Sequence, residues 1–352
     1  MALGHSWLGI RLGAMGSMFV AAVTAATVLS KGTASSTGLA ITLALQLRQA
    51  LTVTIGQINV TRTGLNAIDR VLALASVPSE DGEEEASTPE NWPGDGRVEM
   101  HRIGVQYGKG LPWALNEVSF SLPAGKRLGI VGRTGAGKSS LINALLRFVD
   151  VAAGEILIDG QDISQVPRNR VRDAIRVIPQ DAFLFSGTLR SNVDVFGKHR
   201  DDRIITALRS VHFAPFEQEG EHVIAADLDH EILAGGSNIS HGQRQLVCLA
   251  RAILEDSCRI LVLDEATSGI DHATETAIQQ TIRGSFRGIT VLVVAHKVLT
   301  VADFDSILVL KQGKVVENGA PQQLLAANGE FYNMVEKSED SRKIKELIWR
   351  NK

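Results

Sequence analysis

The segment from Gly132 to Ser139, GRTGAGKS, fits the spacing G-x-x-x-x-G-K-[ST] and has residue types suited to holding phosphate. It follows the apolar run Leu128–Val131 and precedes Ser140–Phe148, which has a helical pattern. In such a strand–loop–helix setting, glycines let backbone N–H groups point at phosphate oxygens, and the helix N-terminus adds the positive end of its dipole. We therefore predict a nucleotide-phosphate site rather than a glycine-rich turn without a ligand. The residues predicted to contact the nucleotide are Gly132, Thr134, Gly135, Ala136, Gly137, Lys138, Ser139 and Ser140.

Two side chains of this loop have more specific predicted roles. The ammonium of Lys138 can reach the β- and γ-phosphates, and the hydroxyl of Ser139 suits a Mg²⁺ ligand. The loop alone does not distinguish an ATPase from a kinase or a GTPase.

An acidic pair follows a second apolar run. Ile260–Leu263 reads as a strand buried on both faces, and Asp264 and Glu265 come directly after it. Ligands of parallel sheets lie outside the carboxyl ends of the strands, where these carboxylates are expected. We predict that Asp264 holds Mg²⁺ and that the catalytic Glu265 orients or deprotonates the attacking water. The alternative is that both acids only favour the dipole of a following helix.

The elements that must position these residues are those of an α/β domain. Short β-rich runs alternate with helical stretches from Arg97 onward, which predicts βαβ units around a mostly parallel sheet. The predicted strands are Val118–Leu122, Leu128–Val131, Ile156–Ile158, Ile260–Leu263, Val291–Val294 and Ile307–Leu310.

The N-terminal region is more apolar. Leu12–Ser30 carries no charged residue, and a bilayer core needs about 20 mostly apolar residues. A cleaved signal peptide is the alternative, but the run is long for one and no convincing cleavage site follows it. Gly38–Val60 is a second apolar segment, interrupted by Arg48; by itself it is as consistent with an amphipathic helix as with a membrane span.

A change in composition marks a predicted linker. The residues from Ser79 to Gly96 are acidic and rich in Gly, Pro and Ser, as in a solvated linker between domains.

The overall charge and the cysteines exclude some functions. The chain has 36 basic and 39 acidic residues, net charge −3, so no basic excess points to nucleic acid. Cys248 and Cys258 match no disulfide framework or zinc spacing and are predicted to be reduced, packed thiols.

A third motif, Asn238–Leu246 (NISHGQRQL), enters a predicted helix over Gln243–Leu254. It resembles the Leu-Ser-Gly-Gly-Gln signature of ATP-binding cassette (ABC) proteins, with matches at Ser240, Gly242 and Gln243 and departures at Ile239 and His241. A hydroxyl and a glycine at a helix N-terminus suit a phosphate. In ABC proteins that phosphate belongs to ATP held by the opposing nucleotide-binding domain.

The resemblance assigns roles to further residues. Gln180 matches the Q-loop glutamine, which touches Mg²⁺ and relays its state to the membrane domain. Asp271 matches the D-loop, and His296 matches the switch histidine that contacts the γ-phosphate. Tyr107 matches the aromatic residue that stacks on adenine, although a strand aromatic packed in a sheet is a serious alternative for it.

The spacing of these motifs resembles ABC transporters, and more closely the second nucleotide-binding domain of the multidrug-resistance-associated (C) subfamily. The resemblance implies an α/β P-loop NTPase cassette with a RecA-like core, an antiparallel β subdomain and a helical subdomain, preceded by two transmembrane α-helices. The implied division is a partial membrane domain at 1–77 (helices at about 12–30 and 38–60), an acidic linker at 78–97, the nucleotide-binding domain at 98–336 and a tail at 337–352.

The departures from the family pattern generate further expectations. His241 stands where glycine is usual, and a side chain there crowds the approach to phosphate, so the composite site that this signature completes is expected to hydrolyse ATP poorly. Two helices are too few to enclose a translocation pathway. We therefore expect residues 1–352 to be the C-terminal piece of a larger transporter.

The predicted function is ATP binding and hydrolysis, with Mg²⁺, that drives export of organic anions, conjugates or drugs. The alternatives are an ATP-binding remnant without transport activity and a non-transport ABC ATPase. The predicted partners are a second nucleotide-binding domain, the remaining transmembrane helices, membrane lipid and a small-molecule substrate, with no nucleic acid. The predicted location is the plasma or vacuolar membrane, with the nucleotide-binding domain in the cytosol.

Overall fold

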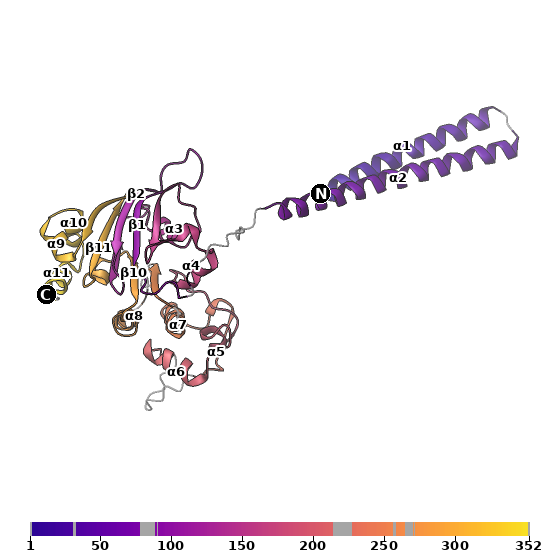
Figure 1. The fold of residues 1–352 in the computed structure, drawn as a ribbon. Coiled ribbons are helices and arrows are strands. Elements are labelled where there is room, and N and C mark those ends of the chain that lie inside the picture. The colour runs from indigo at the N-terminus through magenta and orange to yellow at the C-terminus, as the bar shows by residue number, and fades with distance from the viewer. Residues whose placement is uncertain are drawn as a thin grey trace. The chain divides into compact units, whose positions relative to one another are not determined.

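The structure is a computed structural model that describes residues 2–30, 33–77, 89, 91–213, 227–255, 258–264, 270 and 272–350. The chain divides into two compact units, Met1–Glu80 and Asp81–Lys352. Figure 1 shows the ribbon coloured along the chain.

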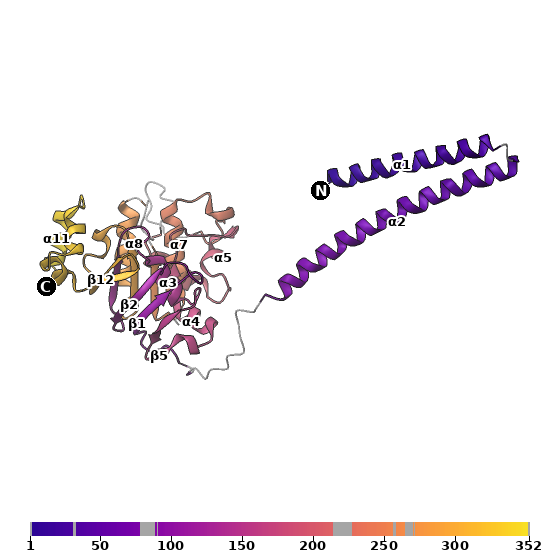
Figure 2. The ribbon, with the colours of Figure 1, turned by 90° about the horizontal axis from the view of Figure 1, so that it is seen from above.

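The first unit is a pair of helices, α1 (Ala2–Leu29) and α2 (Ala34–Ala75), which run side by side (Figure 2). Thr33 caps α2 by accepting a hydrogen bond from the Ser36 N–H. By length and composition α2 is apolar enough to cross a membrane, and Gly13–Leu29 is a shorter apolar stretch. Both helical segments expected from the sequence are therefore present as helices, while their position in a membrane stays a prediction.

Arg48 of α2 crosses α1 at a glycine. A Cβ atom added to Gly16 would lie 2.6 Å from Cγ of Arg48 and 2.9 Å from its Cδ. Any larger residue at position 16 would therefore displace the aliphatic stem of Arg48. The stem of Arg48 thus occupies the space that a side chain at position 16 would fill.

The second unit is built on two sheets. A six-stranded sheet has the order β12-β11-β3-β10-β9-β6, in which β12 is antiparallel to its neighbour and the other strands run parallel. A four-stranded antiparallel sheet has the order β2-β1-β4-β5, and β7 pairs with β8. The strands are β1 Val98–Val105, β2 Leu115–Leu122, β3 Arg127–Val131, β4 Ala153–Ile158, β5 Gln161–Asp162, β6 Ile175–Ile178, β7 Gly187–Thr188, β8 Glu231–Ile232, β9 Ile260–Asp264, β10 Thr290–Ala295, β11 Ser306–Lys311 and β12 Lys314–Gly319.

Helices surround these sheets, and α5, α6 and α7 gather at one end of the unit (Figure 1). The α-helices are α3 Lys138–Leu145, α4 Arg168–Ala174, α5 Leu189–Val193, α6 Asp201–Ser210, α7 His241–Leu254, α8 His272–Gly284, α9 Pro321–Ala326, α10 Glu330–Glu336 and α11 Ser341–Arg350. Short 3₁₀ turns lie at Ile163–Gln165, Ala234–Gly236 and Val298–Val301.

The six-stranded sheet separates two buried clusters. Along β9, Leu261 and Leu263 belong to one cluster, and Ile260 and Val262 belong to the other. Side chains of a strand alternate between its faces, so an uninterrupted apolar run is what a strand covered on both sides requires. The prediction of a buried parallel strand before Asp264 is confirmed on this point.

Residues 91–97, the end of the predicted linker, are bonded to the rest of the second unit. The indole of Trp92 is buried and donates from Nε1 to the carbonyl of Ile158 at 3.0 Å. The carboxylate of Asp159 accepts from the N–H groups of Asp95, Gly96 and Arg97 at 2.7–3.0 Å. These contacts fix the chain immediately before β1.

The predicted tail contains α11, which packs on the domain. Ile344 and Ile348 are fully buried on one face of α11, Leu347 packs partly against the same core, and charged side chains occupy most of the remaining positions.

We expect Ile344→Ala to lower the free energy of unfolding by about 2–4 kcal/mol, because it leaves a cavity in a close-packed core. Urea denaturation of the full chain, followed by tryptophan fluorescence, measures this. Lys343→Ala, at an exposed neighbour on the same helix, is the matched control and should change stability by less than about 0.5 kcal/mol. Equal effects of the two substitutions would contradict the packing of α11.

Both cysteines are free and buried, as the sequence predicts. Burial raises the pKa of the Cys258 thiol to about 11, against a smaller opposite effect of Arg176. In the unfolded chain the pKa of the thiol is about 8.5. The folded state binds the thiol proton more tightly, so the favourable contribution of this group to the free energy of folding is fully present below pH 8.5 and is lost as the pH rises toward 11. In a Cys248→Ser background, we expect iodoacetamide at pH 8 to alkylate Cys258 at least roughly 100-fold faster in urea than in buffer. Similar rates in the two conditions would contradict this burial.

Candidate functional site

Four neighbouring parallel strands end at the same edge of the six-stranded sheet. In the register, Val131 of β3 lies beside Ala295 of β10, Val294 of β10 lies beside Asp264, and Leu263 of β9 lies beside Ile178 of β6. The phosphate loop (Gly132–Ser139), His296, Asp264 and Gln180 therefore leave the sheet at adjacent positions, although they are widely separated in sequence. This is the edge where ligands of such sheets bind.

The phosphate loop folds around the side chain of Lys138. Its ammonium donates to the carbonyl of Gly132 at 2.8 Å and to that of Arg133 at 3.4 Å. Lys138 is only 6% exposed, which is unusual for a lysine and places a positive charge inside the loop. The loop runs into α3, whose first helical residue is Lys138. The predicted strand–loop–helix setting is confirmed.

Two glycines of the loop are required by close backbone contacts. A Cβ atom at Gly132 would lie 2.4 Å from the carbonyl oxygen of Leu310. Gly137 has a φ of +104°, and a Cβ atom there would lie 2.7 Å from the carbonyl oxygen of Ala114. Side chains would thus fill the space in which the loop curls, and the cradle expected for a phosphate depends on their absence.

Tyr107 lies next to the phosphate loop and outside the sheet. It follows the end of β1, and 56% of its surface is exposed, so it is not the packed strand aromatic of the alternative interpretation. Its hydroxyl donates to Oγ of Ser140 at 3.2 Å and accepts from Nδ2 of Asn143 at 3.3 Å. An exposed ring anchored to the helix after the loop is placed to meet a base attached to the phosphates. Asn143 had no distinguishing signal in the sequence.

The predicted metal ligands are oxygen donors contributed by separate segments. Ser139 belongs to α3, Asp264 ends β9, and the exposed Gln180 follows β6. Among the described residues, no group of three or more His, Cys, Asp or Glu side chains forms a metal site. A hydroxyl, an amide and one carboxylate fit Mg²⁺, which is commonly held by few protein ligands together with phosphates and waters. Glu265 and Asp271 lie outside the described residues.

The signature segment (Asn238–Leu246) forms the N-terminus of α7. Ser240 and Gln243 form a capping box: Oγ of Ser240 accepts from the Gln243 N–H at 3.1 Å, and Oε1 of Gln243 accepts from the Ser240 N–H at 2.8 Å. The structure leaves no room for a side chain at Gly242, since a Cβ atom there would lie 2.5 Å from Cγ2 of Ile270. Nδ1 of His241 is buried without a hydrogen-bond partner. The signature residues thus have structural roles in addition to the phosphate contact predicted for them.

A cleft of about 540 Å³ lies between β6, α5 and the end of α7. Three aromatic side chains at this cleft are more than half exposed, namely Phe183, Phe185 and Phe196, and the rings of the first two pack edge to face with centroids 5.3 Å apart. Exposed aromatic side chains of this size commonly mark a contact with another protein segment.

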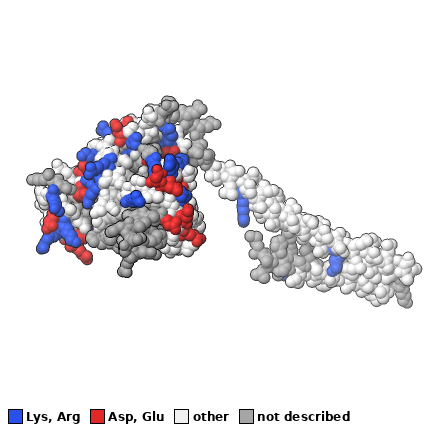
Figure 3. Space-filling model, turned by 90° about the horizontal axis from the view of Figure 1, so that it is seen from below, with Lys and Arg blue, Asp and Glu red and all other residues white. Residues whose placement is uncertain are grey.

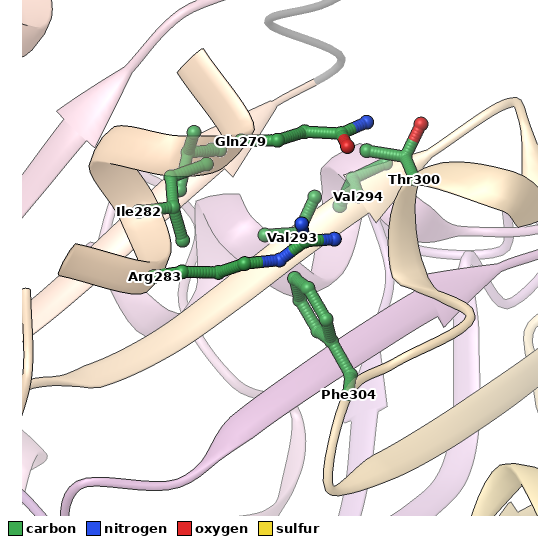
Figure 4. A pocket seen from close by; sticks show the side chains of 8 residues that line it. Gln279, Ile282, Arg283, Val293, Val294, Thr300 and Phe304 are labelled. Carbon is green, nitrogen blue, oxygen red and sulfur yellow. The ribbon is translucent and has the colours of Figure 1, made fainter. Parts of the chain in front are cut away.

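A smaller cavity lies between α8 and β10 (Figure 4). Gln279, Ile282 and Arg283 reach into it from α8. Its volume of about 10 Å³ is near the minimum for one water molecule, so we assign it to packing.

The charged residues are unevenly distributed. The surface of the α1–α2 pair is almost free of charge, whereas the second unit carries Lys, Arg, Asp and Glu interspersed (Figure 3).

Comparison with known proteins gives concordant results. Residues 115–268 match the ABC transporter family. The chain is 40% identical over 94% of its length to ATP-binding cassette sub-family C member 3 of Mus musculus, and 41% identical over 91% to ABC transporter C family member 13 of Arabidopsis thaliana. It covers 22% and 23% of those proteins, about a fifth of their length. A bacterial Atm1-family ABC exporter with ATP bound has a TM-score of 0.72, with 30% identity over 95% of this chain and 58% of that one. The predicted cassette fold and the likeness to the C subfamily are confirmed.

We expect Gly132→Ala to weaken ATP binding at least about tenfold, because its Cβ atom would push the loop away from the Leu310 carbonyl. Isothermal titration with ATP measures this. Gly284→Ala is the control, since a Cβ atom there meets nothing within 4 Å and its backbone is unstrained. Unchanged affinity for Gly132→Ala would show that the loop does not bind phosphate in this conformation.

Proposed function

Because this chain belongs to the ABC transporter family, we propose that its cassette binds and hydrolyses MgATP to drive export of organic anions, conjugates or drugs across a membrane. The observation that carries the proposal is that four neighbouring strands end at the sheet edge that holds the phosphate loop. Chemically different side chains are brought there by the sheet register: a buried ammonium, a carboxylate, an amide and an imidazole.

Each residue of this edge has a distinct role in the proposal. The N–H groups of the phosphate loop and the ammonium of Lys138 neutralise phosphate charge. Ser139, Gln180 and Asp264 hold Mg²⁺, which shields the phosphates when bound. Glu265 orients or deprotonates the attacking water, and His296 contacts the γ-phosphate. Tyr107 stacks on adenine through its exposed ring.

The helices α1 and α2 are proposed to span the membrane. Large apolar side chains on both are more than half exposed, among them Met18, Leu43 and Val60. Such side chains are unfavourable in water and suited to lipid. The stem of Arg48 rests in the space left by Gly16, and we propose that its guanidinium faces a water-filled pathway, because a charge facing lipid is costly.

A second cassette and further transmembrane helices complete the proposed assembly. Ser240, Gly242 and Gln243 at the N-terminus of α7 are proposed to contact ATP bound by the opposing cassette, as is Asp271. The exposed Phe183, Phe185 and Phe196 are proposed to contact the remaining transmembrane helices. His241 adds a side chain at this signature, so the composite site that it completes is expected to turn over more slowly than the site containing Glu265.

The test compares ATP turnover by the full chain in lipid nanodiscs, with and without an added cassette that carries an unaltered signature. We expect turnover to depend on the added cassette and to fall roughly 10²–10⁴-fold in Glu265→Gln, because the water loses its general base. Lys138→Ala should also weaken ATP binding itself.

Lys337→Ala removes an exposed lysine far along the chain from the loop and is the matched control, expected to be neutral. Turnover that is unchanged in Glu265→Gln would remove catalysis from this pocket. ATP binding without turnover, even with the partner cassette, would favour the ATP-binding remnant.

A further inference from the structure

Gln245 links the helix of the signature segment to the Q-loop glutamine. It is 1% exposed on α7, and its Nε2 donates to the carbonyl of Pro179 at 3.0 Å and to that of Gln180 at 2.7 Å. Both acceptors belong to the residues that directly follow β6. The two bonds therefore join α7 to the point where the chain leaves β6, at the same edge of the sheet as the phosphate loop.

Burying the side-chain amide of Gln245 costs free energy, and packing alone does not explain why an amide is found there. Oε1 of Gln245 is buried and has no hydrogen-bond partner. An unsatisfied buried acceptor is unfavourable, and leucine or methionine would fill a similar volume without it. The benefit of glutamine at this site must therefore come from the two bonds of its Nε2.

The rest of the segment after β6 is held by other side chains. Nδ2 of Asn192 donates to the carbonyls of Phe185 and Thr188 at 2.9 and 3.1 Å, and its Oδ1 accepts from the Phe185 N–H at 2.9 Å. Arg251 of α7 donates to the carbonyl of Phe183 at 3.2 Å. Loss of the Gln245 amide would therefore free the residues next to Gln180 and leave those from Phe183 onward in place.

The side chain of Gln180 itself depends on this support. It is exposed, and in the described part of the chain it makes no hydrogen bond of its own. Its direction is thus set by the backbone that carries it, and that backbone is held by Gln245. A metal ligand on an unsupported backbone would have to be ordered at the moment of binding, which lowers affinity.

We propose that Gln245 is a positioning residue that aims Gln180 at Mg²⁺ and couples the metal position to α7. This inference rests on the proposed function, in which Gln180 contacts the metal. Ser240 begins the same helix, so a contact that shifts the N-terminal end of α7 also shifts the amide that holds Gln180. Ser240, which serves the site of the opposing cassette, and the Gln245 amide, which supports Gln180 in this chain's own site, are therefore both carried by α7.

The test separates aiming of the metal ligand from general support of the fold. ATP affinity of the full chain is measured by titration with Mg²⁺ and with EDTA, in wild type, Gln245→Leu, Gln180→Ala and the double variant. Gln245→Leu should weaken MgATP binding roughly threefold to tenfold and leave Mg²⁺-free binding unchanged. Because both residues act through one contact, the double variant should be no weaker than Gln180→Ala alone.

Gln322→Leu is the matched control, since this glutamine also donates its Nε2 to a backbone carbonyl, that of Ile348 at 2.9 Å, but from α9. It should not change the Mg²⁺ dependence. Equal weakening with Mg²⁺ and with EDTA, or additive losses in the double variant, would overturn the proposal. A wild-type chain that binds no ATP, or binds it without regard to Mg²⁺, would instead refute the proposed function on which the inference rests.

If Gln245→Leu folds poorly, Gln245→Met preserves the unbranched shape, and hydrogen exchange gives a second readout. Amides of residues 180–182 should exchange faster in the variant than in wild type, while that of Phe185, which is held by Asn192, should not. Unchanged exchange at 180–182 would show that Gln245 does not support the loop.

Discussion

The site depends on the pairing register of β3, β10, β9 and β6. Ile130, Val294 and Asp264 lie level across three strands, so the phosphate loop, His296 and Asp264 leave the sheet at one edge. A slip of one residue in any strand would turn its apolar side chains to the opposite face and would also shift one functional residue out of line. The two buried clusters on either side of the sheet oppose such a slip, because side chains packed in one cluster would have to fit into the other.

Much of this arrangement follows from local sequence. Unbroken apolar runs such as Ile260–Leu263 identified the buried strands, and the phosphate loop could be recognised because its function constrains the spacing of glycines and lysine over a short stretch. The capping box at Ser240 and Gln243 is local in the same sense, although the resemblance assigns these residues only to nucleotide contact. The apolar runs thus predicted six of the strands, namely β2, β3, β4, β9, β10 and β11, and the resemblance to ABC proteins predicted how the elements are combined.

The contacts that support the site were beyond sequence reasoning. Gln245 and Pro179 are far apart in the chain, and their hydrogen bond cannot be predicted from the type of either residue. Asn143 reaches the Tyr107 hydroxyl, and Trp92 reaches the carbonyl of Ile158, through pairings that exist only once the sheets are assembled. Such bonds depend on three-dimensional proximity, and a single sequence taken by itself carries no record of proximity.

The anchoring of residues 91–97 has a mechanical consequence. Any tension transmitted along the chain toward β1 reaches the indole of Trp92 and then the three N–H groups held by Asp159, before it can reach a strand. Both anchors belong to the end of β4 and the turn after it, so force enters the four-stranded sheet, where neighbouring strands β1, β2 and β4 resist it together in shear. The same segment is also tied to the six-stranded sheet, because Nε of Arg259, the residue before β9, donates to the carbonyl of Gly94 at 3.0 Å. A pull from the N-terminal side is therefore shared between both sheets and does not fall on β1 alone.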